Sequence, residues 1–499
     1  MLEPVNVSLA SLNVATLIPM TIAVVGALAI IVIDLFKSNL DKTLYVMIAM
    51  LFLILDLAAV IGSAGVFTAN GTQLGFFDVM LIDGLAILAQ LIIIIASMMF
   101  IPLALTSKRF HEFSYPEFFA LFLFMIAGFQ FMVSSDNLIL IFVGLETASL
   151  ALYPMIALHN RSKSFEAAVK YFTMGALAAG LFAFGSMVLY ALTGSVEIHQ
   201  IAAVLAADGY ANMGYVLVGT AFLLASFAFK LSLVPFHTWT PDVYEGSSAA
   251  LAGYMSIVPK IAGFVVAMRL FEFLIHSGVV WLEAALYAMV VITMTAANIW
   301  AIVQNDVKRM LAYSSVSHAG FVMSAILIGT TQANTGLFLY WALFSFANLG
   351  AFTMLWVSRQ KVLLPGQSSD HPFEKFSGMF QTSPIQATLM ALFMLTLAGL
   401  PPFALFWGKL YLIGAAVSGG FTVLALIMAL NSAVAGYYYL KLIVYMFMRD
   451  PIQEQDYMVN ASTSLKAIVG MAAFASIFLF LAVSPMIEFI GAFVYNSGY

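Results

Sequence analysis

Long apolar segments follow one another along almost the whole chain, with short polar connections between them. A helix of about 20 residues crosses about 30 Å of hydrocarbon, and each segment is at least roughly that long. The seventh and the twelfth segments are interrupted by proline, at Pro235 and at Pro401-Pro402. The pattern predicts fourteen membrane-spanning helices near residues 13–36, 43–62, 79–105, 115–133, 137–158, 165–193, 212–239, 249–273, 281–303, 308–329, 333–358, 384–415, 420–447 and 467–493.

Composition agrees with this pattern. Of the 499 residues, 63% are hydrophobic and only 9% are charged, whereas soluble proteins carry about 25% charged residues. The chain is therefore expected to be an all-α integral membrane protein. Its first apolar segment is too long for a signal peptide and has no basic region before it, so we expect it to be retained as a helix.

Several kinds of chemistry are not expected from this sequence. The chain has no cysteine to hold an iron–sulfur cluster or form a disulfide. It has no phosphate-binding loop, no dinucleotide fingerprint and no histidine spacing typical of haem. The sequence contains no basic patch of the kind that would indicate a nucleic-acid partner. We therefore expect no cofactor or metal in this chain, and energy must come from an ion gradient or from partner subunits.

The positive charges of the loops predict the orientation. Alternate connections contain no lysine or arginine, and such asymmetry over short loops indicates which side is cytoplasmic. Both termini are accordingly expected on the non-cytoplasmic side. The inward connections hold Lys37, Lys42, Lys108, Arg109, Arg161, Lys163, Arg309, Arg359, Lys361, Lys375, Arg449 and Lys466.

The two interrupted helices lie five apart, which predicts an internal repeat. Helices 4–8 and 9–13 would form two five-helix units, and an odd number of helices makes the second unit cross the bilayer in the opposite sense. Inverted repeats with discontinuous helices are typical of secondary transporters. The expected divisions are 1–112 for helices 1–3, 113–276 and 277–450 for the two repeats, and 451–499 for helix 14.

Ionisable residues within apolar spans are the candidate functional residues, because burying a charge costs several kcal/mol unless it is paired or hydrated. Glu146 and Lys260 lie near the middle of helices 5 and 8, Lys230 and Lys409 flank the two breaks, and His318 lies within helix 10. In one interpretation they transfer protons, with Glu146 as the partner of Lys230. In the other, they are structural ion pairs between helices.

Other ionisable residues leave more alternatives open. Lys308 is either a second relay residue or a topology signal, Lys441 would extend to the membrane surface, and Asp56 lacks an evident partner. Three further residues would either line an inner polar entrance or lie in loops, namely His237, Asp242 and Glu245. We expect His199 and His276 to lie in loops.

Four motifs resemble the antiporter-like membrane subunits of respiratory complex I. They are Asn137–Glu146, Leu150–Pro154, Pro235–Gly246 and Asp306–Ser315, and the resemblance covers essentially the whole chain. Fourteen helices without a long lateral C-terminal helix argue against the L type of this family. A lysine at position 409, where the M type has glutamate, argues against that type.

The resemblance implies proton translocation coupled to electron transfer from NADH to quinone. It assigns Glu146, Lys230, Lys260 and Lys409 to the family's residues on helices 5, 7, 8 and 12. It also implies that NADH, FMN, iron–sulfur clusters and quinone bind to partner subunits, with K-like and M-like subunits as neighbours in a bacterial inner membrane or its equivalent. The alternatives are a subunit of a multi-subunit Na⁺/H⁺ antiporter, of a membrane-bound hydrogenase or plastid-type complex, or a purely structural subunit.

Overall fold

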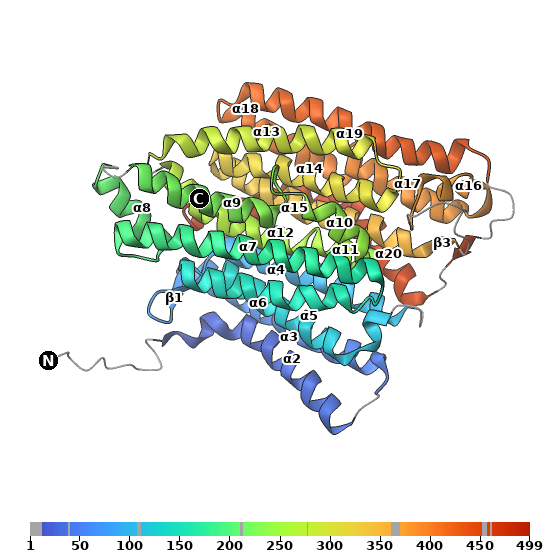
Figure 1. Ribbon diagram of the computed structural model, residues 1–499, viewed down its shortest axis with the longest axis horizontal. Helices are drawn as coiled ribbons and strands as arrows, with labels where there is room; N and C mark the ends of the chain where they lie inside the picture. The colour runs from blue at the N-terminus through green and yellow to red at the C-terminus, as the bar shows by residue number, and fades with distance from the viewer. Residues whose placement is uncertain are drawn as a thin grey trace.

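The computed structural model describes residues 12–37, 40–106, 111–209, 213–276, 278–360, 370–451, 457–459 and 462–499. In these parts of the chain, long helices lie side by side, with α2 and α3 at one edge of the molecule and α18 and α19 at the opposite edge (Figure 1). The main helices are α2 (Ile18–Phe36), α3 (Lys42–Asn70), α4 (Gly84–Phe100), α5 (Pro116–Val133), α6 (Leu138–Ala157), α7 (Ser162–Thr193), α9 (Met213–Leu231), α10 (Trp239–Gly246), α11 (Ala249–Met255), α12 (Val258–His276), α13 (Val280–Ile302), α14 (Val307–Ile328), α15 (Thr331–Val357), α17 (Pro384–Ala398), α18 (Ala404–Ser418), α19 (Thr422–Met448), α20 (Thr463–Phe478) and α21 (Val483–Asn496).

Smaller elements lie at the two ends of the bundle. One end carries β1 and α8, and the other carries β3 and α16 (Figure 1). The chain terminus at Tyr499 lies with Thr72 and His199 around one cavity, so it belongs to the end that carries β1 and α8. The small elements are β1 (Gln73–Gly75), β2 (Met80–Ile82), α8 (Ile198–Ala207), β3 (Ser358–Gln360), α16 (Met379–Thr382), β4 (Tyr457–Val459) and 3₁₀ turns at Val14–Leu17, Ile101–Leu105, His111–Ser114, Phe373–Phe376 and Leu479–Ala482.

The membrane character and the helical fold are confirmed. Within the described residues, 12 helical segments are long and apolar enough to span a bilayer. They match twelve of the predicted spans. The other two predicted spans, 249–273 and 384–415, fall on the interrupted pairs α11–α12 and α17–α18. The total of fourteen crossings and the domain boundaries remain predictions.

Helix ends follow local sequence signals. Asp83, Asn137 and Asp306 cap α4, α6 and α14, each accepting hydrogen bonds from backbone N–H groups of the first turn. The opposite ends of α14 and α17 stop at Gly329 and Gly399, where φ is 60° and 77°, a conformation that favours glycine. Such caps satisfy backbone groups that lipid leaves unsatisfied.

Close helix contacts depend on small residues. A Cβ atom at Gly128 of α5 would lie 2.7 Å from the backbone nitrogen of Ala148, and one at Gly144 of α6 would lie 2.7 Å from the carbonyl oxygen of Gly128. Two backbones this close leave no room for side chains. This contact holds α6, which carries Glu146, against α5.

Corresponding helices of the two five-helix units pack in corresponding ways. The pairs α5–α6, α6–α7 and α7–α9 have counterparts in α13–α14, α14–α15 and α15–α17. Helices α14 and α15 are the most buried spans and lie inside the bundle, whereas α3, α7 and α19 each expose a broad apolar face. The core of the molecule is therefore formed around α14, the helix that carries His318.

Candidate functional site

Lys230 is the second-last residue of α9, directly before the first helix break. Its Nζ donates a hydrogen bond to Ser149 Oγ of α6 at 2.8 Å, and its side chain is buried. Beyond it the helix is interrupted at Ser232, where φ is 62°. Trp239 Nε1 donates to the carbonyl oxygen of Phe229 at 2.9 Å, so α10 itself satisfies one of the backbone acceptors that the break releases.

Lys409 lies in α18, after the second break. Its Nζ donates to the carbonyl oxygens of Leu397 at 3.1 Å and Ala398 at 2.9 Å, at the end of α17. The ammonium group therefore binds the negative end of the helix that precedes the break. A Cβ atom at Gly399 would lie 2.6 Å from Lys409 Cδ, so the small residue leaves space for this lysine.

Lys260 marks a third interruption, which differs from the expected continuous helix over 249–273. Helix α11 ends at Met255 and α12 begins at Val258, with Lys260 in its first turn. Trp341 Nε1 donates to the carbonyl oxygen of Ile257, between the two helices, at 3.0 Å. Pro259 occupies the first turn of α12, where proline costs no hydrogen bond, so it gave no obvious sign of a break.

Lys260 faces the central helix α14. Its Nζ donates to the carbonyl oxygen of Ser315 at 2.9 Å and to Ser315 Oγ at 2.7 Å. Like Lys230 and Lys409, it is buried and contacts neutral oxygen atoms. Within the described residues, none of these three lysines has a carboxylate within 4.0 Å.

Glu146 is half-buried on α6, one turn before Ser149. It interacts electrostatically with Lys230 but forms no ion pair with it within the described structure. The expected partners are therefore near each other, with the lysine hydrogen-bonded to the neighbouring serine.

His318 is fully surrounded by protein at the middle of α14. Its Nε2 hydrogen bonds with Tyr439 Oη at 2.9 Å, and its Nδ1 hydrogen bonds with Tyr340 Oη. A cavity of about 10 Å³ lies beside it, lined by Lys409 among others. A space of this size holds about one water molecule.

Lys308 lies at the start of α14 and contacts the end of α10. Its Nζ donates to the carbonyl oxygens of Glu245, at 2.9 Å, and of Ser247. Helix α10 is the second half of the first broken helix, so Lys308 joins that half to the central helix of the second repeat. This geometry favours a positioning role for Lys308.

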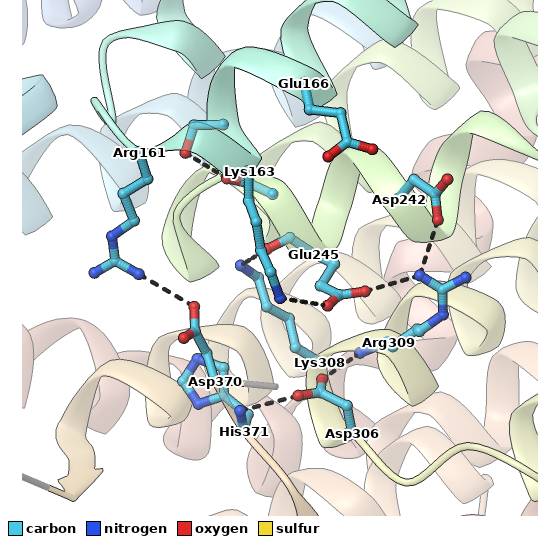
Figure 2. A network of polar contacts seen from close by, with 12 residues as sticks. Arg161, Lys163, Glu166, Asp242, Glu245, Asp306, Lys308, Arg309, Asp370 and His371 are labelled. Carbon is cyan, nitrogen blue, oxygen red and sulfur yellow. Dashed lines mark hydrogen bonds and ion pairs between the residues drawn. The ribbon is translucent and has the colours of Figure 1, made fainter. Parts of the chain in front are cut away.

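A network of charged side chains surrounds this contact (Figure 2). Arg309 Nη1 lies 2.9 Å from Asp242 Oδ1 and 2.8 Å from Glu245 Oε2, and Lys170 lies 2.9 Å from Asp242 Oδ2. A cavity of about 160 Å³ opens between Lys163, Lys170, Asp242 and Glu245. Asp242 and Glu245, expected at an inner polar entrance or in a loop, belong to α10 and line this cavity.

His237 does not line the cavity. Its ring stacks on that of Trp300 with centroids 4.6 Å apart, and its Nδ1 is buried without a hydrogen-bond partner.

Asp370 joins the charged network through Arg161, at 3.1 Å. Burial alone would raise the pKa of Asp370, but the positive charges of His371 and Arg161 outweigh it and lower that pKa.

A second polar region lies at the opposite end of the bundle. Arg269 of α12 forms two hydrogen bonds of 2.7 Å with Asp83, and both side chains are buried. Next to this pair, a cavity of about 390 Å³ is lined by Asp136, Glu197 and His199. His199, which was expected in a loop, belongs to α8 and hydrogen bonds with Asp136.

Asp56, which had no evident partner in the sequence, contacts Gln130 of α5. Both carboxyl oxygens accept from Gln130 Nε2, at 2.9 and 2.7 Å, and both side chains are wholly buried. Gln130 Oε1 has no hydrogen-bond partner among the described residues. A protonated Asp56 avoids burying a charge beside a neutral amide.

Asp56→Asn should therefore leave the protein close to wild type in stability, within about 1 kcal/mol, since asparagine keeps the shape and the hydrogen-bonding groups of the neutral acid. Asp56→Leu should cost about 1–3 kcal/mol, because Gln130 then has no partner. Thermal unfolding of the detergent-solubilised protein measures both. A marked loss with asparagine would show that the charged form is needed.

Sequence reasoning missed the neutral partners of the lysines and of His318. Ser149, Ser315, Tyr340 and Tyr439 have hydroxyl groups and no charge, and such residues are frequent in membrane helices. Ser315 belongs to the Asp306–Ser315 motif, which was the only signal available. Within the described residues, no group of three potential metal ligands occurs.

Comparisons with known proteins agree with this fold. A family model described as NADH:quinone oxidoreductase/Mrp antiporter matches residues 135–435, more than half of the chain. The NADH-quinone oxidoreductase subunit N of Sulfurimonas denitrificans is 74% identical over 100% of both chains.

Two solved structures are similar over nearly the full length. Respiratory complex I from Thermus thermophilus contains a chain with a TM-score of 0.75 and 28% identity, covering 94% of this chain and 98% of that one. A chain of the Mrp complex from Dietzia sp. has a TM-score of 0.82 and 19% identity, covering 96% and 97%, and shows the fold alone. The full-length identity and the family model together show that this chain belongs to the family of NADH-quinone oxidoreductase N subunits.

Proposed function

We propose that this chain translocates protons across the membrane as part of an NADH:quinone oxidoreductase, through Lys230, Lys260, His318 and Lys409. The observation that carries the proposal is the environment of the three lysines. Each is buried beside a helix interruption and, within the part of the chain that the structure describes, donates hydrogen bonds only to neutral oxygen atoms. A structural ion pair would place a carboxylate there. A lysine without one releases its proton far more easily, because desolvation favours the neutral amine.

The proposed route runs from the first broken helix to the second. Protons enter from the cytoplasmic side toward Lys230, pass through Lys260 and the α14 region, and leave from Lys409. His318 lies within electrostatic reach of both Lys260 and Lys409, which supports its place between them. The charged network and its cavity of about 160 Å³ at the end of α10 support an aqueous entrance.

Glu146 acts as the gate of this route. Approach of Glu146 would stabilise the protonated form of Lys230, and its departure would favour proton release. The observed hydrogen bond from Lys230 to Ser149 corresponds to the separated state of this pair. Charges of a neighbouring subunit set the balance between the two states.

The basic residues of the loops support a cytoplasmic location for the charged network of Figure 2 and a location on the other side for both termini. NADH, FMN, the iron–sulfur clusters and quinone bind to other subunits, with K-like and M-like subunits as membrane neighbours. The energy for proton transfer therefore reaches this chain through subunit contacts.

Lys230→Ala should reduce NADH-driven proton pumping at least about tenfold, since a positioned proton-transfer group commonly contributes on the order of 10²–10⁴-fold. Acidification of vesicles that contain the purified complex measures it. Lys42→Ala is the matched control, because Lys42 also donates to an oxygen acceptor, the Thr106 carbonyl, but lies outside the repeats. Pumping at the wild-type rate in Lys230→Ala would refute the assignment.

A Na⁺/H⁺ antiporter subunit is the second candidate, because the Mrp complex shares the fold. Deletion of the gene distinguishes the two. Loss of NADH:quinone activity supports the proposal, whereas sensitivity to salt and alkali with normal respiration supports the antiporter.

A further inference from the structure

Two buried tyrosines occupy both nitrogens of His318. Tyr439 of α19 contacts Nε2 at 2.9 Å, and Tyr340 of α15 contacts Nδ1. Both tyrosine side chains are 0% exposed. A neutral imidazole has one donor and one acceptor nitrogen, and a hydroxyl can serve either of them. The arrangement therefore works in either tautomer.

Tyr439 continues the chain of hydroxyl groups away from His318. Its Oη also hydrogen bonds with Ser314 Oγ of α14. Ser315, the next residue, accepts a hydrogen bond from Lys260 Nζ at 2.7 Å. A series of hydrogen bonds thus runs from Ser314, the neighbour in sequence of the residue that Lys260 contacts, through Tyr439 to the imidazole of His318.

On the other side, Tyr340 and His318 line the cavity of about 10 Å³ together with Lys409. Ser432 also lines it, and Ser432 Oγ is buried without a hydrogen-bond partner. A single water bound there would meet several polar groups, as buried waters require. It would connect Tyr340 with Lys409.

We propose that Tyr439 and Tyr340 carry protons, forming with His318 a hydrogen-bonded wire from Ser314 to the cavity at Lys409. The inference rests on the proposed function, which assigns His318 and the lysines to the route. It adds two residues that have no charge of their own. The three rings belong to three different helices, with His318 on α14, Tyr340 on α15 and Tyr439 on α19. The wire therefore connects three helices of the predicted second repeat.

Each transfer moves one proton, and the net change is one proton taken up at Ser314 and one added to Lys409. Tyr439 gives its hydroxyl proton to His318 Nε2 while it receives one from Ser314, and a proton delivered from the side of Lys260 replaces that of Ser314. His318 releases its Nδ1 proton to Tyr340, whose own proton passes through the cavity to a neutral Lys409 amine. Rotation of the hydroxyl groups and return of the imidazole to its first tautomer then restore the starting state.

A purely structural role would make different demands. A buried tyrosine hydroxyl is satisfied by one partner, and Tyr439 Oη contacts two, Ser314 Oγ and His318 Nε2. Tyr254 is the contrasting case. It is equally buried, and its hydroxyl contacts Ser97 Oγ at 2.7 Å, away from the lysines.

The test uses the intact complex in vesicles, with Tyr439→Phe, Tyr254→Phe and Lys409→Gln compared with wild type. Phenylalanine keeps the ring and removes only the hydroxyl. We expect Tyr439→Phe to lower NADH-driven pumping by about tenfold, with a larger solvent deuterium isotope effect because proton transfer becomes limiting. Tyr254→Phe should keep both quantities at their wild-type values.

The outcomes separate the two levels of inference. Wild-type pumping in Tyr439→Phe with impaired pumping in Lys409→Gln overturns the wire and leaves the proposed function intact. Wild-type pumping in both overturns the proposed function as well. An equal loss in Tyr254→Phe, or a loss in Tyr439→Phe without a change in the isotope effect, assigns Tyr439 to packing and overturns the wire. If the complex with Tyr439→Phe does not assemble, Ser314→Ala provides the test instead. Reduced pumping in Ser314→Ala supports the wire, and unchanged pumping overturns it.

Discussion

Vesicles that contain complex with Lys409→Gln should acidify at about a tenth of the wild-type rate or less when NADH is supplied. Glutamine keeps a polar group near the carbonyl oxygens of Leu397 and Ala398, which Lys409 Nζ contacts at 3.1 and 2.9 Å, but it cannot take up or release a proton. The break between α17 and α18 should therefore persist while transfer through it stops. Initial rates of acidification and of NADH oxidation, measured on the same vesicles, give the ratio of protons to electrons.

Lys441→Gln is the matched control for this substitution. Lys441 also donates to a backbone carbonyl, that of Gln304 at 3.1 Å, but it is partly exposed and lies outside the proposed route. Its replacement should leave the ratio unchanged. If both variants pump at the wild-type rate, Lys409 is not the residue from which protons leave.

Arg269→Met should destabilise the protein by about 3–5 kcal/mol, the usual cost of leaving one partner of a buried ion pair without the other. Asp83 would then be a buried carboxylate without the two 2.7 Å hydrogen bonds that it now accepts. Helices α4 and α12, which the pair joins, should separate at lower temperature. The midpoint of thermal unfolding in detergent, and the amount of protein in the membrane, measure the loss.

The double variant Arg269→Met with Asp83→Asn tests the cause. Asparagine still caps α4, where Asp83 now accepts from Ala86 N at 2.9 Å, and it removes the unpaired charge. Much of the lost stability should therefore return. A double variant that is less stable than Arg269→Met would show that the two side chains contribute separately.

The helices were predictable because lipid imposes length and hydrophobicity on every span. The breaks at Pro235 and Pro401 were predictable for a related reason, since proline within a span releases a carbonyl group. The interruption between α11 and α12 was not, because Pro259 lies in the first turn of α12. Helix α8, within a predicted outer connection, was not expected either.

The candidate residues were found by their charge, and their partners were not. An isolated lysine is conspicuous in an apolar span, whereas Ser149, Ser315 and Tyr439 are not. Asp56 shows the same limit, because Gln130 lies 74 residues away in the sequence and only the packing of α3 against α5 brings them together. Hydrogen bonds between distant helices depend on their relative rotation, which hydrophobic patterns leave undetermined.

The two broken helices differ in what their lysines hold. Lys230 donates to a side-chain hydroxyl of a neighbouring helix, whereas Lys409 binds the exposed backbone acceptors of α17. Loss of the proton from Lys409 therefore weakens the electrostatic attraction that joins α17 to α18, and its return restores it. Charging should alter the mechanical stiffness of the second break and leave that of the first nearly constant. The two halves would then differ in function. Protonation would drive a conformational change at the second break and not at the first.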